Sequence, residues 1–277
     1  MEPMKVLIPT DFSQQADFAY LMTKKLGGKM PVDVHFLHVL NPGQGIATDS
    51  EGMPVEGGDI DPEFFGEMEQ MSKEKLKVLE KNTGAPAYLK IGQLTDEIIE
   101  FAEDNEFDLV VMGTKGASGL KEFISGSETQ QVVRHSHVPV LSLMCDRSDL
   151  QIRNILVVHD YKKEKPIQLR LLRTISDAWN AKVNLLYVKK DNEDIEKIRS
   201  TMEHFATYNG LENFETHIHG DNAVEDGVIH FNQMHDMDII CIGTHGYTGM
   251  KHLIRGSIAE SIVNHLYKPI ITYHLKK

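Results

Sequence analysis

The chain has 277 residues, 41% apolar and 25% charged, which is close to the average for globular proteins. It contains no run approaching the roughly 20 apolar residues of a membrane-spanning helix, and its first residues lack the pattern of a secretory signal. We therefore expect a cytoplasmic protein that does not associate with membranes. The formal net charge of −12 argues against general nucleic-acid binding, which depends on neutralising backbone phosphates.

Strand and helix patterns alternate along the first half of the chain. We expect strands over residues 5–9, 32–39, 87–90, 108–112 and 138–143, and helices over 14–26, 62–81, 94–105 and 127–135. Residues 41–60 are rich in glycine, proline and aspartate without any period, which predicts a surface loop.

The second half repeats the first. KVLIPTD (5–11) matches NILVVHD (154–160), and VDVHFLHVL (32–40) matches AKVNLLYVK (181–189). Residues 107–120 likewise match 237–250, and residues 125–143 match 255–273. Four matched blocks in one order indicate a duplication. We place the domains at 1–146 and 151–277, on either side of a short polar stretch, with a helix of the second half beginning near Asp191.

Several expected strands are continuous apolar runs, such as LVVM, ILVV and IICI. Such runs are typical of parallel strands that are covered on both faces. The fold class is therefore α/β, with two tandem doubly wound domains.

One glycine spacing follows the fourth expected strand of each half. Its residues are Gly113, Gly116, Gly126 and Ser127 in the first half, and Gly243, Gly246, Gly256 and Ser257 in the second. Glycines at the carboxyl edge of an α/β sheet let the backbone approach a ligand, and the helix that follows offers free N–H groups to a phosphate. The alternative is that the glycines serve tight turns and the serines cap helices.

The spacing G-2x-G-9x-G-[ST] resembles the motif of the ATP-binding branch of the universal stress protein family, and the resemblance covers nearly the whole chain. It implies an adenine nucleotide, ATP, with any Mg²⁺ carried by the nucleotide. It also implies a five-stranded parallel sheet of order 3-2-1-4-5, flanked by helices, in each half. Fifth strands often pair between domains in this family, so a pseudo-dimer within the chain is implied and a homodimer is possible.

The resemblance also assigns roles to residues outside the glycine motif. It places Asp11 and Asp160 beside the adenine, although both aspartates also suit a loop or a helix cap. The backbone of Val39 and Val188 would contact the adenine edge. The positions that would help enclose the ribose and base are Met112 and Ile242.

The two halves differ just after the Gly-Ser pair. The second half keeps an apolar Ile258, whereas the first has Glu128. A carboxylate in the first turn suits the helix dipole but repels a triphosphate at the same helix end. We therefore expect the second half to hold the stronger site.

The sequence contains no nucleophile beside a base and no carboxylate pair with metal-binding spacing. This pattern favours a regulatory stress-response protein with little or no dedicated catalysis, at most slow ATP hydrolysis. A module for interaction or dimerisation that binds no nucleotide is the alternative. The loops after the first strands lack the Ser-Gly-Gly-x-Asp pattern of adenylating ATP pyrophosphatases, which argues against that enzyme class.

The spacing of histidines and cysteines indicates no metal or redox site. His217 and His219 share a face of an expected strand, and His135 and His137 lie at a helix end, but neither pair has ligand partners at a recognised spacing. We predict no metal site. Cys145 and Cys241 have no close partner and fit structural burial.

Overall fold

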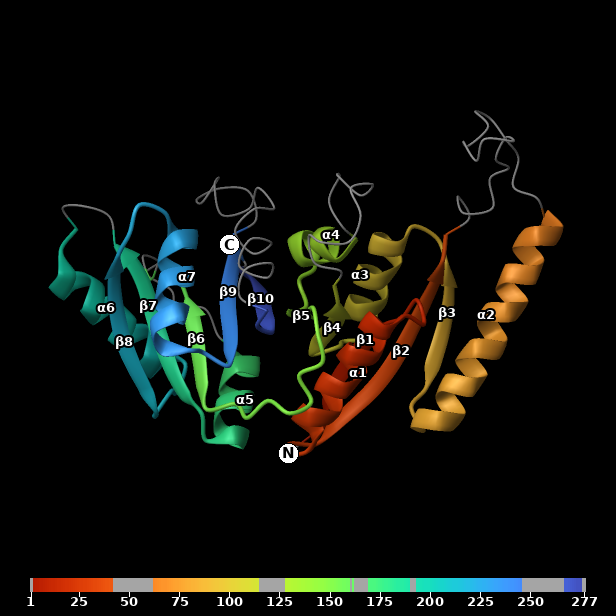
Figure 1. Cartoon of the computed structure of the whole chain (residues 1–277), viewed down its shortest axis with the longest axis horizontal. Helices are drawn as coiled ribbons and strands as arrows, with labels where there is room; N and C mark the ends of the chain where they lie inside the picture. Colours follow the sequence, from red (N-terminus) through yellow and green to blue (C-terminus); the bar gives the residue numbers. More distant parts are fainter. Residues whose placement is uncertain are drawn as a thin grey trace, which may run out of the picture.

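A computed structural model describes residues 2–41, 62–114, 128–159, 161, 169–189, 193–245 and 267–275 of the chain. Its centre is one ten-stranded sheet of order β3-β2-β1-β4-β5-β10-β9-β6-β7-β8, with the two halves side by side (Figure 1). The strands are β1 (Met4–Pro9), β2 (Val32–Leu40), β3 (Ala87–Ile91), β4 (Leu109–Gly113), β5 (Val140–Leu143), β6 (Asn154–Val158), β7 (Lys182–Lys189), β8 (Phe214–Gly220), β9 (Ile239–His245) and β10 (Ile270–Leu275).

The order 3-2-1-4-5 is confirmed in both halves. All strand pairs within a half are parallel; Val6 on β1, for example, pairs with Val34 on β2 and Leu109 on β4. An equivalent aspartate fixes the start of the first strand in each half. Asp108 accepts a hydrogen bond from the backbone N–H of Lys5, and Asp238 accepts one from that of Asn154. The duplication read from the sequence is therefore also a duplication of structure.

The helices cover both faces of the sheet. They are α1 (Gln14–Gly27), α2 (Pro62–Thr83), α3 (Leu94–Asp104), α4 (Glu128–His135), α5 (Arg170–Trp179), α6 (Ile195–Tyr208) and α7 (Val224–His235). Side-chain caps mark two starts, because Ser13 accepts a hydrogen bond from the N–H of Ala16 and Asp194 accepts from the N–H groups of Glu196 and Lys197. The helix expected to begin near Asp191 therefore begins at Ile195, directly after its N-cap, Asp194. None of the helices in the described part of the chain is long and apolar enough to cross a membrane.

The two halves join through β5 and β10, which pair antiparallel (Figure 1). Leu141 lies opposite Ile271, and both side chains are buried in the same core. Next to this pair, the Thr272 hydroxyl donates to the carbonyl oxygen of Val140 at 3.2 Å, and the Ser142 hydroxyl donates to that of Ile270 at 3.5 Å. The expectation that the fifth strands lie together is confirmed.

Among the described residues, the core is continuous across the junction on one face of the sheet. A single apolar cluster there contains residues of α1 and β1 from the first half and of α5, α6 and β6 from the second. The opposite face carries two separate clusters, one beneath α3 and α4 and one beneath α7. Trp179 on α5 adds a contact between the halves, because the ammonium groups of Lys25 and Lys29 lie 5.5 and 5.9 Å from its ring centroid.

Because Leu141 belongs to this shared core, we predict that Leu141→Ala lowers the free energy of unfolding by about 2–5 kcal/mol. Urea unfolding followed by circular dichroism and by the fluorescence of Trp179, the only tryptophan, measures the effect. Both probes should report one shared transition, since the core joins the halves. The matched control is Val78→Ala on the surface of α2, where we expect a change within about 0.5 kcal/mol. Separate transitions for the two probes would contradict a shared core.

Candidate functional site

The carboxyl ends of β2, β1 and β4 are neighbours, because these parallel strands are adjacent in the sheet. Asp11 follows β1, Val39 is near the end of β2, and Met112 and Gly113 end β4. The described residues of the expected site in the first half therefore share one sheet edge, where open α/β sheets bind ligands. In the second half, Val188 lies near the end of β7, and Ile242 and Gly243 lie in β9. The remaining expected residues lie outside the described part of the chain: Gly116, Gly126, Ser127, Asp160, Gly246, Gly256, Ser257 and Ile258.

Asp11 lies exposed in the turn between β1 and α1. Its Oδ1 accepts a hydrogen bond of 3.0 Å from the backbone N–H of Ser13, which is itself the N-cap of α1. His38 on β2 contacts the same turn, with its Nδ1 2.7 Å from the Thr10 carbonyl oxygen. These contacts hold the carboxylate in place beside the carboxyl edge. They give Asp11 a structural role in the turn, which is compatible with contact to a ligand.

An aromatic residue with left-handed backbone follows the strand-end aspartate in each half. Phe12 has φ of 62° and Tyr161 has φ of 50°. For bulky residues this conformation costs on the order of 1–3 kcal/mol and persists only where the surroundings enforce it. Phe12 packs on His38, whereas Tyr161 donates its hydroxyl hydrogen to the carbonyl oxygen of Val157 at 2.9 Å. Sequence reasoning missed this feature, although an aromatic after the aspartate in both repeats is a visible signal.

The four apolar positions of the expected site have buried side chains. Val39 and Met112 are 7% exposed and belong to the core beneath α3 and α4. Their counterparts Val188 and Ile242 are 9% and 3% exposed and belong to the core beneath α7. At these positions the backbone at the strand ends, more than the side chain, is therefore available to a ligand.

Gly113 allows α1 to approach the end of β4 closely. A Cβ atom at this position would lie 2.0 Å from the backbone carbonyl oxygen of Gln15, far inside van der Waals contact. The first glycine of the motif thus has a packing role, independent of any ligand.

We accordingly predict that Gly113→Ala destabilises the protein by about 1–3 kcal/mol, since the backbone of α1 must move. The matched control is Gly66→Ala within α2, where an added Cβ would meet nothing within 4 Å. There alanine should stabilise the helix by about 0.5–1 kcal/mol. Denaturant titrations of both variants measure these opposite changes, and unchanged stability of Gly113→Ala would remove the packing role.

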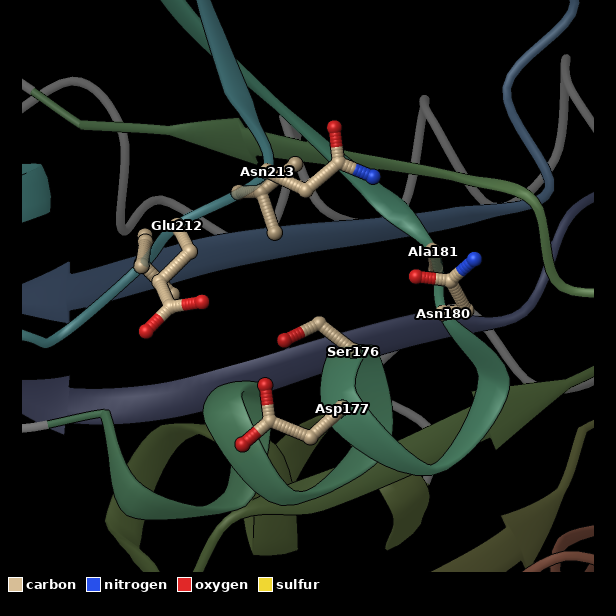
Figure 2. Close-up of a pocket in the computed structure, with 8 residues that line it drawn as sticks. Ser176, Asp177, Asn180, Ala181, Glu212 and Asn213 are labelled. Carbon is tan, nitrogen blue, oxygen red and sulfur yellow. The ribbon is translucent and has the colours of Figure 1, made fainter.

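A hollow of about 200 Å³ lies at the amino ends of β7 and β8 in the second half (Figure 2). It is lined by the end of α5, the start of β7 and the segment before β8, with the carboxylates of Asp177 and Glu212 beside it. Ligands of open α/β sheets bind at the carboxyl ends of the strands, whereas this hollow is at the amino ends. We therefore assign it no part in the candidate site.

Of the two cysteines, Cys241 fits the expected structural role most clearly. Its side chain on β9 is 2% exposed, and burial raises the pKa of its thiol to about 12. Cys145, beyond β5, is partly exposed.

This difference predicts selective labelling of the native protein. The thiolate is the reactive form, so iodoacetamide should label Cys145 and leave Cys241 unmodified until the protein unfolds. Peptide mass spectrometry before and after denaturation measures both sites. Equal labelling of the two thiols in native protein would contradict the burial of Cys241.

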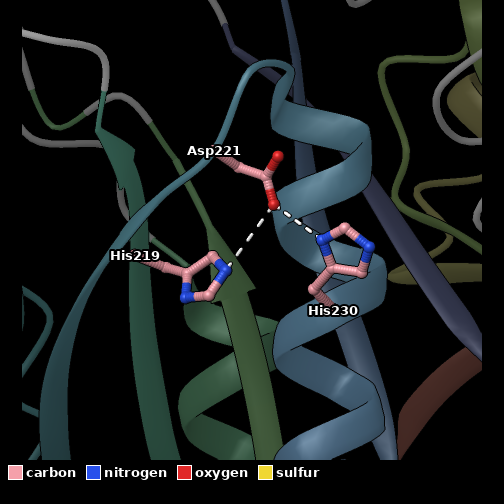
Figure 3. Close-up of side chains that lie close together, drawn as sticks. All are labelled: His219, Asp221 and His230. Carbon is pink, nitrogen blue, oxygen red and sulfur yellow. Dashed lines mark hydrogen bonds and ion pairs between the residues drawn. The ribbon is translucent and has the colours of Figure 1, made fainter.

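The histidine pair on β8 has different surroundings at each position. His217 Nε2 lies 3.0 Å from Asn184 Oδ1, and its pKa is lowered, mainly because burial disfavours the charged ring. His219 instead lies near Asp221, just beyond β8, and His230 on α7 (Figure 3). No spacing along a single element indicates this trio, because its third member, His230, comes from the next helix.

Comparisons with known proteins agree with the fold and the repeat. The sequence profile of the universal stress protein family matches residues 3–143 and 151–274. A universal stress protein of Methanocaldococcus jannaschii is 30% identical over 140 residues, which cover 50% of this chain and 79% of the relative. A universal stress protein of Synechocystis sp. is 22% identical over 284 residues, or 95% of this chain and 96% of the relative. The structure of one from Archaeoglobus fulgidus shares the fold with a TM-score of 0.72 and 22% identity over 99% of both chains. The chain belongs to the universal stress protein family.

Proposed function

We propose that this universal stress protein binds ATP at the carboxyl edge of its sheet and acts as a regulator, not as a dedicated catalyst. The domains we propose are residues 1–146 and 151–277. One observation carries the proposal: the same glycine spacing occurs in both halves, beginning at Gly113 in β4 and Gly243 in β9. That spacing resembles the ATP-binding branch of the family. The cytoplasmic location expected from the sequence stays a prediction.

The proposed ligand contacts divide between the base and the phosphates. Asp11 and Asp160 would lie beside the adenine, whose edge would meet the backbone of Val39 and Val188. Met112 and Ile242 would close the ribose side through the ends of their strands. The phosphates would meet the backbone N–H groups of the glycine segment and of the helix after Gly-Ser, with Mg²⁺ carried by the nucleotide.

The two proposed sites should differ in affinity for ATP. Helix α4 begins at Glu128, so the first half has an acidic residue at the start of the helix that would receive the phosphates. The second half has Ile258 at the matching position. Repulsion between a carboxylate and a triphosphate weakens binding, so the second half should bind more tightly.

Calorimetric titration with ATP and magnesium tests both the site and the asymmetry. Ser257→Ala should weaken binding modestly, and Gly246→Leu should weaken it more because a side chain obstructs the close approach of the backbone. Glu128→Val should strengthen binding in the first half. Ser148→Ala, in the exposed segment between the halves, is the control and should bind like the unaltered protein. An unchanged titration of Glu128→Val would show that the charge argument is wrong.

An interaction module that binds no nucleotide is the second candidate, and one observation favours it. Phe64, Met71 and Val78 are exposed at seven-residue spacing on α2, which places them along one stripe of the helix. Mass spectrometry of small molecules released from the purified protein separates the candidates. Co-purified adenine nucleotide supports the proposed function. Absence of nucleotide, together with no titration by ATP and magnesium, supports the interaction module.

A further inference from the structure

Three metal-ligating side chains meet where β8 is connected to α7. His219 is the penultimate residue of β8, Asp221 follows the strand, and His230 lies on α7. Figure 3 shows the two imidazole rings turned toward the carboxylate between them. The group lies outside the proposed nucleotide contacts.

The distances within this group suit one shared ion. His230 Nδ1 is 2.7 Å and His219 Nε2 is 3.6 Å from the same carboxylate oxygen, Asp221 Oδ2. All three ligand atoms lie within 4.8 Å of one another. Ligands at the usual 2.0–2.2 Å from a tetrahedral Zn²⁺ are about 3.3 Å apart, so small side-chain movements would bring all three into contact with one ion.

The carboxylate is held in position by a second interaction. Asp221 Oδ1 accepts a hydrogen bond of 2.8 Å from the backbone N–H of Asn222, which leaves Oδ2 facing the two rings. Hydrogen bonds of this kind orient metal ligands. The same interactions, with that from His230 the largest, lower the pKa of Asp221, so the carboxylate is ionised as a ligand must be.

The group is partly open to solvent. The Asp221 side chain is 12% exposed, that of His219 is 25% exposed and that of His230 is 56% exposed. An ion can therefore reach the carboxylate and keep water in a remaining coordination position. His219 also lies edge-on against Phe231 of α7, with 6.4 Å between the ring centroids.

The first half of the same chain provides an internal comparison. Val188 in the second half is equivalent to Val39 in the first. In the sheet, Val188 pairs with His219 and Val39 pairs with Lys90, so His219 corresponds to Lys90. Two residues later, Asp221 corresponds to Gly92. At the same position from the start of the helix, His230 corresponds to Glu100. The strand and helix form in both halves, so this fold does not require the histidine and aspartate side chains.

We propose that His219, Asp221 and His230 form a binding site for a divalent transition metal ion such as Zn²⁺, with at least one coordination position open to solvent. Two imidazoles and one carboxylate suit Zn²⁺ and similar ions, whereas Mg²⁺ and Ca²⁺ select oxygen ligands. The bound ion links the end of β8 to α7. The proposed metal site shares no residue with the proposed nucleotide contacts, although His219 pairs with Val188 in the sheet, and the proposal stands whether or not ATP binds.

Calorimetric titration of chelator-treated full-length protein with ZnCl₂ tests the site. We expect the unaltered protein to show a binding event that Asp221→Asn and His230→Ala each weaken about tenfold or more. His204→Ala removes an exposed histidine of α6 and is the matched control, which should leave this event unchanged. Asparagine retains the shape of aspartate and His230 is largely exposed, so both variants should fold, as circular dichroism would verify.

Thermal unfolding provides a second measurement. Zn²⁺ should raise the melting temperature of the unaltered protein and of His204→Ala more than that of Asp221→Asn or His230→Ala, because an ion that binds only the folded protein stabilises it. If Asp221 and His230 formed only an ion pair with each other, Zn²⁺ would change the melting temperature equally in all four proteins. Equal Zn²⁺ affinity in the unaltered protein and both site variants, or no binding by the unaltered protein, would overturn the proposal.

Discussion

The antiparallel pairing of β5 with β10 is the interaction on which the arrangement of the chain depends. Without it, each half would present an apolar strand as an open sheet edge, which is prone to pair with other chains. The duplication places both partner strands in one molecule, so the pairing does not depend on protein concentration. Leu141 and Ile271 close the shared core on one face, while the Ser142 and Thr272 hydroxyls bond to the opposite strand. The contact thus joins two domains into one sheet.

Sequence reasoning predicted the bounds of the strands and helices of the first half to within two residues. The fourth strand was expected to end at Met112 and ends at Gly113, and the helix expected from residue 94 begins at Leu94. Local chemistry decided the remaining details. Asp194 caps α6, so this helix begins at Ile195 and not at the acidic residues near Asp191. The left-handed backbone of Phe12 depends on packing that no local sequence pattern encodes. The His219 trio was missed because spacing along one element cannot reveal ligands from two elements.

The candidate nucleotide site shows why a glycine motif alone is ambiguous. Gly113 has a packing reason to be glycine, because an added Cβ would collide with the backbone of Gln15 on α1. It therefore fits both a tightly packed structural edge and a ligand-binding edge. Substitution of the later glycines of the motif, Gly246 and Gly256, would distinguish these interpretations, because only the ligand-binding one predicts a loss of nucleotide affinity. Buried side chains at Val188 and Ile242 point to the same conclusion, that recognition at this edge would rely mainly on backbone atoms.

The duplication also separates what the fold requires from what each half adds. The sheet order and the aspartate that fixes the first strand are the same in both halves, whereas side chains at the carboxyl edge differ. Lys90 in the first half stands where His219 stands in the second, and Glu128 stands where Ile258 does. Because paired fifth strands and a common core maintain the scaffold, edge positions can change without altering the fold. Two equal folds can thereby hold two unequal sites, and both the stronger nucleotide site and the metal site that we propose belong to the second half.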